Sequence, residues 1–138
     1  MYELALSEGV GIFDYALPLC GAVSVMDGKD CFIGLDNSRR YSDSERKTML
    51  AHELGHCQTG AFYNEYTPYS VRGKCERRAD EWAILNCVPY DALMNAFRSG
   101  VHRNFELAEH FGVSEQLIAK ALKYYIERKY NASYRENS

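Results

Sequence analysis

The sequence lacks a long hydrophobic run, an internal repeat and any low-complexity tract. An apolar stretch lies within the first 25 residues, but Asp14 and Pro18 interrupt it and no Lys or Arg precedes it. Such a stretch is too short to cross a bilayer and does not have the organisation of a signal peptide. We therefore expect a cytoplasmic protein that has no membrane partner.

The chain also lacks a large excess of charge of either sign. Its 16 Lys and Arg residues and 19 Asp and Glu residues give a formal net charge of -3 at pH 7. A charge of this size provides no overall attraction to nucleic acid or to an anionic membrane. Composition therefore identifies no partner, and a binding function has to come from local motifs.

The cysteines show no sign of a disulfide framework. The five cysteines form no CxxC pair, and their number is odd. Small buried thiols in a reducing compartment are the simplest interpretation, and they agree with a cytoplasmic location. The cysteines expected to be free are Cys20, Cys31, Cys57, Cys75 and Cys87.

The part of the sequence before residue 42 predicts a small sheet. The content of 46% hydrophobic and 25% charged residues is that of a globular protein, and 138 residues suit one compact domain. After a short helix over residues 1–8, three β-rich stretches cover residues 11–18, 22–27 and 31–36. Gly28 in "DGKD" can take the positive φ of a hairpin turn. We expect three antiparallel strands, with residues 31–36 as an edge strand that could pair with a substrate.

The remainder of the sequence predicts helices. Ser42 and Glu45 form a capping box, so a helix should run over residues 43–57 and end before Gly60. A loop over residues 59–73 precedes a second helix, which ends before Pro89. Helical patterns continue from residue 90 onward. The predicted class is α+β, with a core over residues 1–90 and a helical extension over residues 91–138 that packs on it.

The motif that carries chemistry is "HELGH" within the first long helix. His52 and His56 are four residues apart, so both imidazoles lie on one side of a helix and can reach one metal ion. Glu53 follows His52 and can hold a water beside that ion without being a ligand. The spacing therefore predicts two metal ligands and a catalytic general base, Glu53.

A catalytic zinc needs a third protein ligand. Glu76 lies on the following helix, and Asp80 lies one turn later on the same face, where it can accept a hydrogen bond from a ligand histidine. A site made by two histidines and one glutamate leaves the fourth zinc position open for water. Cys75 is the alternative third ligand, and the absence of any metal is a further alternative. Glu81 faces away from Glu76.

The extended motif HExxHxxGxxH does not apply. Thr59 and Phe62 occupy the positions where this motif requires Gly and His. A third histidine ligand at that spacing is therefore excluded.

Three stretches of the sequence resemble a known family. "LAHELGH", followed by "CERRADEWA" and by "GVHRNFELAEHFGVSEQLIAKALKYY", resembles the ImmA/IrrE metallopeptidases, in particular short members from phages and mobile elements of Gram-positive bacteria. The resemblance covers roughly residues 9–130. Trp82 stands where the family often has Phe, and the sensor domain of some members is absent.

This resemblance implies a minimal zincin-like fold and one Zn²⁺, with Mn²⁺ or Fe²⁺ as alternatives. His52, His56 and Glu76 would bind the metal, and Glu53 would be the catalytic base. The implied activity is that of a zinc endopeptidase whose substrate is a helix-turn-helix (Xre-type) repressor encoded nearby, so that cleavage relieves repression. The alternative is an inactive zincin that acts as a repressor-binding or DNA-binding module.

Two further features concern the stabilisation of the reaction's oxyanion and contact with DNA. The oxyanion of the reaction needs a hydrogen-bond donor, and the candidates in the sequence are Tyr63, Tyr66, Tyr69, Arg72 and His102. The stretch "LAEHFGVSEQLI" fits a helix-turn-helix pattern, but residues 102–138 carry six Lys or Arg and five Asp or Glu. DNA contact by this segment is therefore disfavoured, because DNA-binding modules show a strongly basic face.

Overall fold

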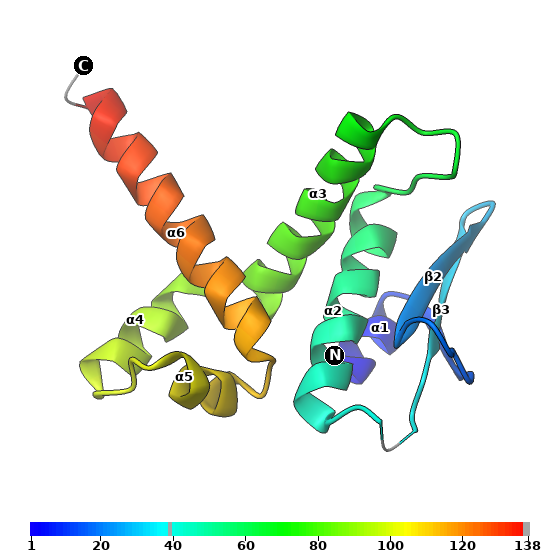
Figure 1. Ribbon diagram of the computed structural model, residues 1–138, viewed down its shortest axis with the longest axis horizontal. Helices are drawn as coiled ribbons and strands as arrows, with labels where there is room; N and C mark the ends of the chain where they lie inside the picture. The colour runs from blue at the N-terminus through cyan, green and yellow to red at the C-terminus, as the bar shows by residue number, and fades with distance from the viewer. Residues whose placement is uncertain (39, 137–138) are drawn as a thin grey trace.

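The computed structural model describes residues 1–38 and 40–136. Within them the chain forms a small sheet and six helices, in an α+β arrangement. Figure 1 shows α2 between the sheet on one side and α3 on the other, with α4, α5 and α6 on the side away from the sheet. The elements in chain order are α1 (Tyr2–Ser7), β1 (Gly11–Asp14), β2 (Ala22–Asp27), β3 (Asp30–Leu35), α2 (Asp43–Thr59), α3 (Tyr69–Cys87), α4 (Tyr90–Arg98), α5 (Asn104–Phe111) and α6 (Glu115–Glu136).

The sheet is mixed, so the prediction of three antiparallel strands was wrong. β2 pairs antiparallel with β3 through the predicted turn, where Gly28 has a φ of 63°. β1 pairs parallel with β3, and the strand order is β1-β3-β2. The reason is that β1 and β2 are joined by residues 15–21 rather than by a tight turn, which lets β1 lie on the far side of β3. β3 is therefore central, and the free edge beside α2 belongs to β2 rather than to residues 31–36.

The helix that carries the HELGH motif begins as predicted and ends slightly later. The amide of Glu45 donates to the Ser42 hydroxyl at 3.1 Å and the amide of Ser42 donates to the Glu45 carboxylate at 3.2 Å, which confirms the capping box. The helix extends to Thr59, and Gly60 follows with a left-handed φ of 69°. Both ends of α2 are thus fixed by local sequence.

The loop between α2 and α3 is shorter than predicted. α3 begins at Tyr69, directly after Pro68, so Gly73 lies inside the helix rather than at the end of a loop. Proline favours the start of a helix because its φ is already close to the helical value and it has no N–H to satisfy. Glycine and the tyrosines of this stretch obscured the helical pattern in the sequence.

Two clusters of buried side chains surround α2. One joins α2 to the sheet and α1 and includes Leu50, Leu54 and Ile33, all fully buried. The other joins α2 and α3 to the helices that follow and includes Leu107 and Ile118. α2 is therefore held on both faces, which fixes the direction of its remaining, cleft-facing side chains.

The second cluster draws side chains from both sides of residue 90. The division into a core over residues 1–90 and an extension over residues 91–138 stays a prediction. None of the described helices combines the length and the apolar character needed to cross a bilayer.

The backbones of α2 and α3 approach each other closely at Gly55. A Cβ atom at this position would lie 2.5 Å from the carbonyl oxygen of Ala79 and 2.8 Å from its Cα. No real side chain fits at such distances, so the two helix backbones are in direct contact here. This contact sets the separation of α2 and α3 along the part of each helix that bears chemistry.

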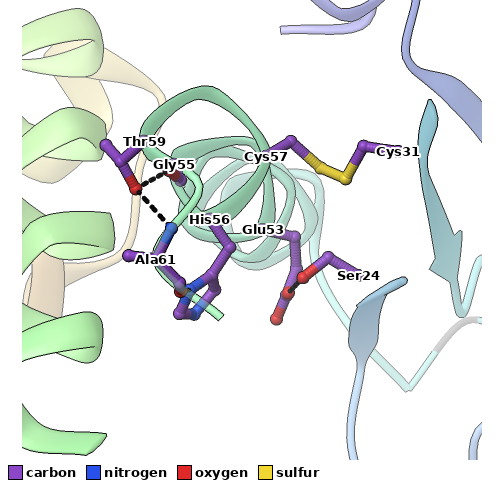
Figure 2. The surroundings of a disulfide bond; sticks show 8 residues. All are labelled: Ser24, Cys31, Glu53, Gly55, His56, Cys57, Thr59 and Ala61. Carbon is purple, nitrogen blue, oxygen red and sulfur yellow. Dashed lines mark hydrogen bonds between the residues drawn. A yellow bond between two sulfur atoms is a disulfide. The ribbon is translucent and has the colours of Figure 1, made fainter. Parts of the chain in front are cut away.

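A disulfide joins the sheet to α2, which contradicts the prediction that all five cysteines are free. Cys31 at the start of β3 is bonded to Cys57 near the end of α2, with their Cα atoms 5.9 Å apart (Figure 2). A separation of 26 residues gives no sequence signal for this pair, since only the packing of the sheet on α2 brings the two residues together. Cys20, Cys75 and Cys87 are free. Disulfides are uncommon in reducing compartments, so this bond does not favour the cytoplasmic location, which stays a prediction.

Replacing both Cys31 and Cys57 with Ser is expected to lower the free energy of unfolding by about 3 kcal/mol, because the bond closes a loop of 26 residues in the unfolded chain. Urea denaturation measures the loss. The unsubstituted protein should lose the same amount in reductant, whereas the double variant should not respond to it, and the exposed Cys20→Ser is the control. Equal stability of both proteins without reductant would contradict the expectation.

Replacing Gly55 with Ala is expected to destabilise the protein by roughly 2 kcal/mol, because the added methyl group forces two packed backbones apart. Gly73→Ala is the matched control, since a Cβ there would meet the flexible end of Arg77 at 3.3 Å and alanine is the better helix former. Thermal unfolding of both variants provides the comparison. The expectation is wrong if the two variants unfold at the same temperature.

Candidate metal centre

The two histidines of α2 point to one place between the sheet and α3. His52 and His56 are one turn apart, and their Nε2 atoms are 3.2 Å from each other. The His56 side chain is buried, whereas the His52 side chain is about one quarter exposed. The spacing of the HELGH motif thus brings two nitrogen donors to one point, as the sequence predicted.

The turn after α2 fixes the ring of His56. The hydroxyl of Thr59 donates to the carbonyl of Gly55 at 2.7 Å and accepts from the amide of Ala61 at 3.3 Å (Figure 2). The carbonyl of Ala61 then lies 2.6 Å from Nδ1 of His56. A carbonyl can only accept, so Nδ1 carries the proton and Nε2 keeps its lone pair free for a metal.

Asp80 on α3 fixes the ring of His52 in the same way. The Oδ1 atom of Asp80 accepts from Nδ1 of His52 at 2.8 Å, and its Oδ2 atom accepts from Nζ of Lys120 at 3.1 Å. Burial works against an ionised Asp80, but the hydrogen bond from His52 and the charge of Lys120 outweigh it and lower the pKa of the carboxyl. Asp80 therefore stays an acceptor, and Nε2 of His52 points toward Glu76.

The surroundings of His52 also favour positive charge at this point. Burial lowers the pKa of the imidazole, but the hydrogen bond and the charge of Asp80 outweigh it, with help from the charges of Glu76 and Glu53, so the net shift of the pKa is upward. An environment that stabilises an imidazolium also stabilises a cation held by the imidazole.

Glu76 brings its carboxylate to both histidines from the opposite helix. Its two oxygens lie 2.8 Å from Nε2 of His52 and 3.4 Å from Nε2 of His56. The hydroxyl of Tyr63 donates to the same carboxylate at 2.7 Å, and this hydrogen bond raises the pKa of the tyrosine. The donor atoms of His52, His56 and Glu76 all lie within 4.8 Å of one another.

These distances fit one small divalent cation. Ligand atoms about 2.0–2.1 Å from a tetrahedral Zn²⁺ are separated by about 3.3 Å from each other. The two imidazole nitrogens are 3.2 Å apart, and each lies 2.8 or 3.4 Å from its nearer oxygen of Glu76, which are similar distances. Two imidazoles and one carboxylate are also the ligand set of open, catalytic zinc sites.

The other residues of α3 that could bind a metal, Cys75 and Glu81, have different partners. The thiol of Cys75 is buried and lies 3.8 Å from the carbonyl of Phe62. Glu81 accepts a hydrogen bond from the hydroxyl of Tyr124 on α6. The geometry therefore agrees with Glu76 rather than Cys75 as the third donor.

Glu53 lies beside the three donors and contacts the sheet. The hydroxyl of Ser24 on β2 donates to Oε2 of Glu53 at 2.5 Å (Figure 2). Glu53 lines two pockets, one on each side of it. The α6-side pocket, of about 270 Å³, is lined by Gly21, Met49, His52, Glu53, Leu117 and Lys120 among others. The Tyr63-side pocket, of about 220 Å³, is lined by Val23, Ser24, Glu53, His56, Tyr63 and Glu76 among others.

The structure distinguishes among the candidate oxyanion donors. The hydroxyl of Tyr63 reaches the donor cluster through Glu76. Arg72, in the first turn of α3, contacts the backbone of the preceding loop, where its Nε donates to the carbonyl of Thr67 at 2.8 Å. Tyr66, Tyr69 and His102 also have exposed side chains, but among the described contacts none of them hydrogen-bonds to Glu76 as Tyr63 does. Tyr63 is thus the candidate that touches the site.

A family model described as the IrrE N-terminal-like domain, of the M78 peptidases, matches residues 32–123. The chain belongs to the M78 metallopeptidase family. The matched range contains His52, Glu53, His56 and Glu76, and it covers more than half of the chain. No curated protein and no solved structure gives a significant match.

Membership in the M78 family confirms the resemblance drawn from the sequence and a metallopeptidase with a zincin-like fold. It also implies a protein substrate and a divalent metal. The sequence did not reveal Ser24, Lys120 or the carbonyl of Ala61. No local motif marks these groups, because each meets the site through packing of a distant segment.

Replacing Asp80 with Asn is expected to weaken the affinity for Zn²⁺ about 10- to 100-fold, because the ligand His52 loses the charged acceptor that orients it. Competition with a chromophoric chelator measures the affinity. Glu81→Gln is the matched control on the same helix, since Glu81 contacts Tyr124 rather than His52. Equal affinities of the two variants would rule out this role for Asp80.

Proposed function

We propose that this M78 family member is a zinc-dependent endopeptidase in which His52, His56 and Glu76 bind Zn²⁺ and Glu53 is the general base. The observation that carries the proposal is the convergence of three donor atoms, spaced for one cation, next to a carboxylate that is not among them. Three protein ligands leave a fourth position for water or substrate, which is the arrangement of catalytic rather than structural zinc.

Bound Zn²⁺ would supply Lewis acidity, which polarises a peptide carbonyl and makes a water acidic near neutral pH. Glu53 accepts a proton from the attacking water and delivers it to the departing amine. Ser24 supports this role because its hydrogen bond to Oε2 orients the carboxylate and leaves Oε1 available to the water. Tyr63 is placed to donate to the oxyanion after its hydroxyl leaves Glu76.

The free edge of β2 supports an extended substrate. β2 is paired on one side with β3, and its residues 22–24 line the pockets that contain Glu53. An extended peptide can add to such an edge through main-chain hydrogen bonds, which provide affinity with little demand on side chains. The segment cleaved must therefore be able to leave its folded structure, as a linker can.

The two pockets on either side of Glu53 support an endopeptidase. A peptide crossing Glu53 has side chains on both sides of the bond that is cut, and each pocket can receive one of them. In an exopeptidase, the substrate-binding cleft would instead have to be closed at one end, where it binds the terminus of the substrate chain.

The substrate we propose is a helix-turn-helix repressor of a phage or mobile element. This part of the proposal is supported by the resemblance to short ImmA/IrrE proteins and by the requirement for an extended linker. Cleavage between the DNA-binding and oligomerisation parts of such a repressor would relieve repression.

Glu53→Gln is expected to abolish cleavage, with a loss of at least about 1,000-fold, and to leave Zn²⁺ affinity unchanged, because the general base is removed and the ligands are kept. The test is to incubate the protein and Zn²⁺ with the repressor encoded nearest to its gene and to measure intact masses. A defined pair of fragments from the unsubstituted protein alone is the expected result.

The control for this experiment is removal of the metal with a chelator, followed by its return. If the unsubstituted protein binds the repressor but leaves it intact at every metal tested, the inactive zincin that only captures its partner is the correct alternative.

A further inference from the structure

A basic groove lies between α3 and α6, next to the proposed active site. The groove has a volume of about 490 Å³. Figure 1 shows the two helices diverging from the region where α6 begins. The cationic side chains that line it are Lys74, Arg77, Arg78, Lys120 and Lys123.

The cations of the basic groove are largely uncompensated. Of the five, Lys120 is paired, with Asp80 at 3.1 Å, while no ion pair links the other four to any described residue. Three acids also line the groove: Asp80 contacts His52 and Lys120, and Glu81 contacts Tyr124 and Arg128. With Glu127 as the third acid, the five cations are in excess by two charges. All five cationic residues are exposed. In a chain whose net charge is -3, this is a local excess of positive charge.

The basic groove adjoins the α6-side pocket, with the ion pair of Asp80 and Lys120 at the boundary. Asp80 and Lys120 line both, and the α6-side pocket also contains His52 and Glu53. A chain that crosses Glu53 and passes over the Asp80–Lys120 pair would reach the groove. The floor of the groove includes Ile84 and the ring of Tyr124, which can pack against the apolar parts of an extended segment.

We propose that the basic groove is an exosite that binds an acidic stretch of the substrate, on one side of the bond that is cut. This inference rests on the proposed peptidase function and adds the substrate's charge pattern to it. The acidic side chains would meet Arg77, Arg78 and Lys123, while the neighbouring segment occupies the α6-side pocket. Cleavage would thus favour a linker flanked by Asp and Glu.

A peptide fits the shape of this site better than duplex DNA does. The cations line a recess between two helices, whereas DNA-reading helices protrude so that they can enter the major groove. Glu81 and Glu127 also line the recess and would repel a continuous row of phosphates. A peptide can place its acidic side chains at the cations and avoid both glutamates.

The test uses two fluorescein-labelled 14-residue peptides, identical except that four consecutive Glu residues in one are Gln in the other. Glu53→Gln protein binds either peptide without cleaving it, and fluorescence anisotropy gives Kd. The groove variant adds Arg77→Glu and Lys123→Glu to this protein. The matched control adds Lys29→Glu and Arg98→Glu, which lie outside the groove and change the net charge by the same amount. Thermal unfolding verifies that both variants are folded.

The expected result is that the acidic peptide binds about tenfold or more tightly than the neutral one, and that added salt reduces the difference. The groove variant should lose this preference, and the control variant should keep it. Equal Kd values for the two peptides, or equal losses in the two variants, would overturn the proposal. Binding of a duplex oligonucleotide that depends on Arg77 and Lys123, with no preference for the acidic peptide, would also overturn it.

These measurements distinguish a failure of the exosite from a failure of the peptidase function. If the unsubstituted protein cleaves both peptides with equal kcat/KM and the groove variant is unaffected, the exosite is wrong and the peptidase stands. If the acidic peptide binds in the groove but no peptide or repressor is cut, the peptidase is wrong and the groove binds acidic peptides for capture alone.

Discussion

The contact between Gly55 and Ala79 is the constraint on which the rest of the site depends. The donor atoms of α2 and α3 have to converge within a few ångströms, and side chains as short as His and Glu can do so only if the helix backbones are close. With no side chain at Gly55, the backbone of α3 approaches to the distance at which Glu76 reaches both imidazoles. Since packed interiors have low compressibility, a methyl group here would move Glu76 away from the two imidazoles.

Around that contact, each group is positioned by a different part of the chain. His56 is held by the turn that follows its own helix, His52 by Asp80 on the opposite helix, and Glu53 by Ser24 on the sheet. The disulfide between Cys31 and Cys57 adds a covalent link between the sheet and the helix that carries all three. These contacts fix ring orientation and carboxylate direction, as the proposed catalytic metal site requires.

Much of this could be predicted from the sequence because the signals are local. The HELGH spacing, the capping box at Ser42 and the separation of Glu76 from Asp80 each depend on the geometry of a single helix, and helical geometry is the same in every protein. The position of β1, the disulfide and the start of α3 could not be predicted in this way. Each depends on the packing of segments that are far apart, or, at Pro68, on a helix start hidden among glycine and tyrosines. Ser24 and Lys120 were missed for the same reason.

The contact of Lys120 with Asp80 has a thermodynamic consequence. Lys120 lines the basic groove, and two hydrogen bonds through Asp80 connect it to His52, a proposed metal ligand. If a cation is bound at His52 and an anion at Lys120, as proposed, the anion competes with Asp80 for Lys120 and so changes the carboxylate that orients His52. Coupling between two sites is reciprocal, so each of the two proposed ligands would then change the affinity for the other by the same factor. Through this contact α6 would influence the proposed metal site without contributing a ligand to it.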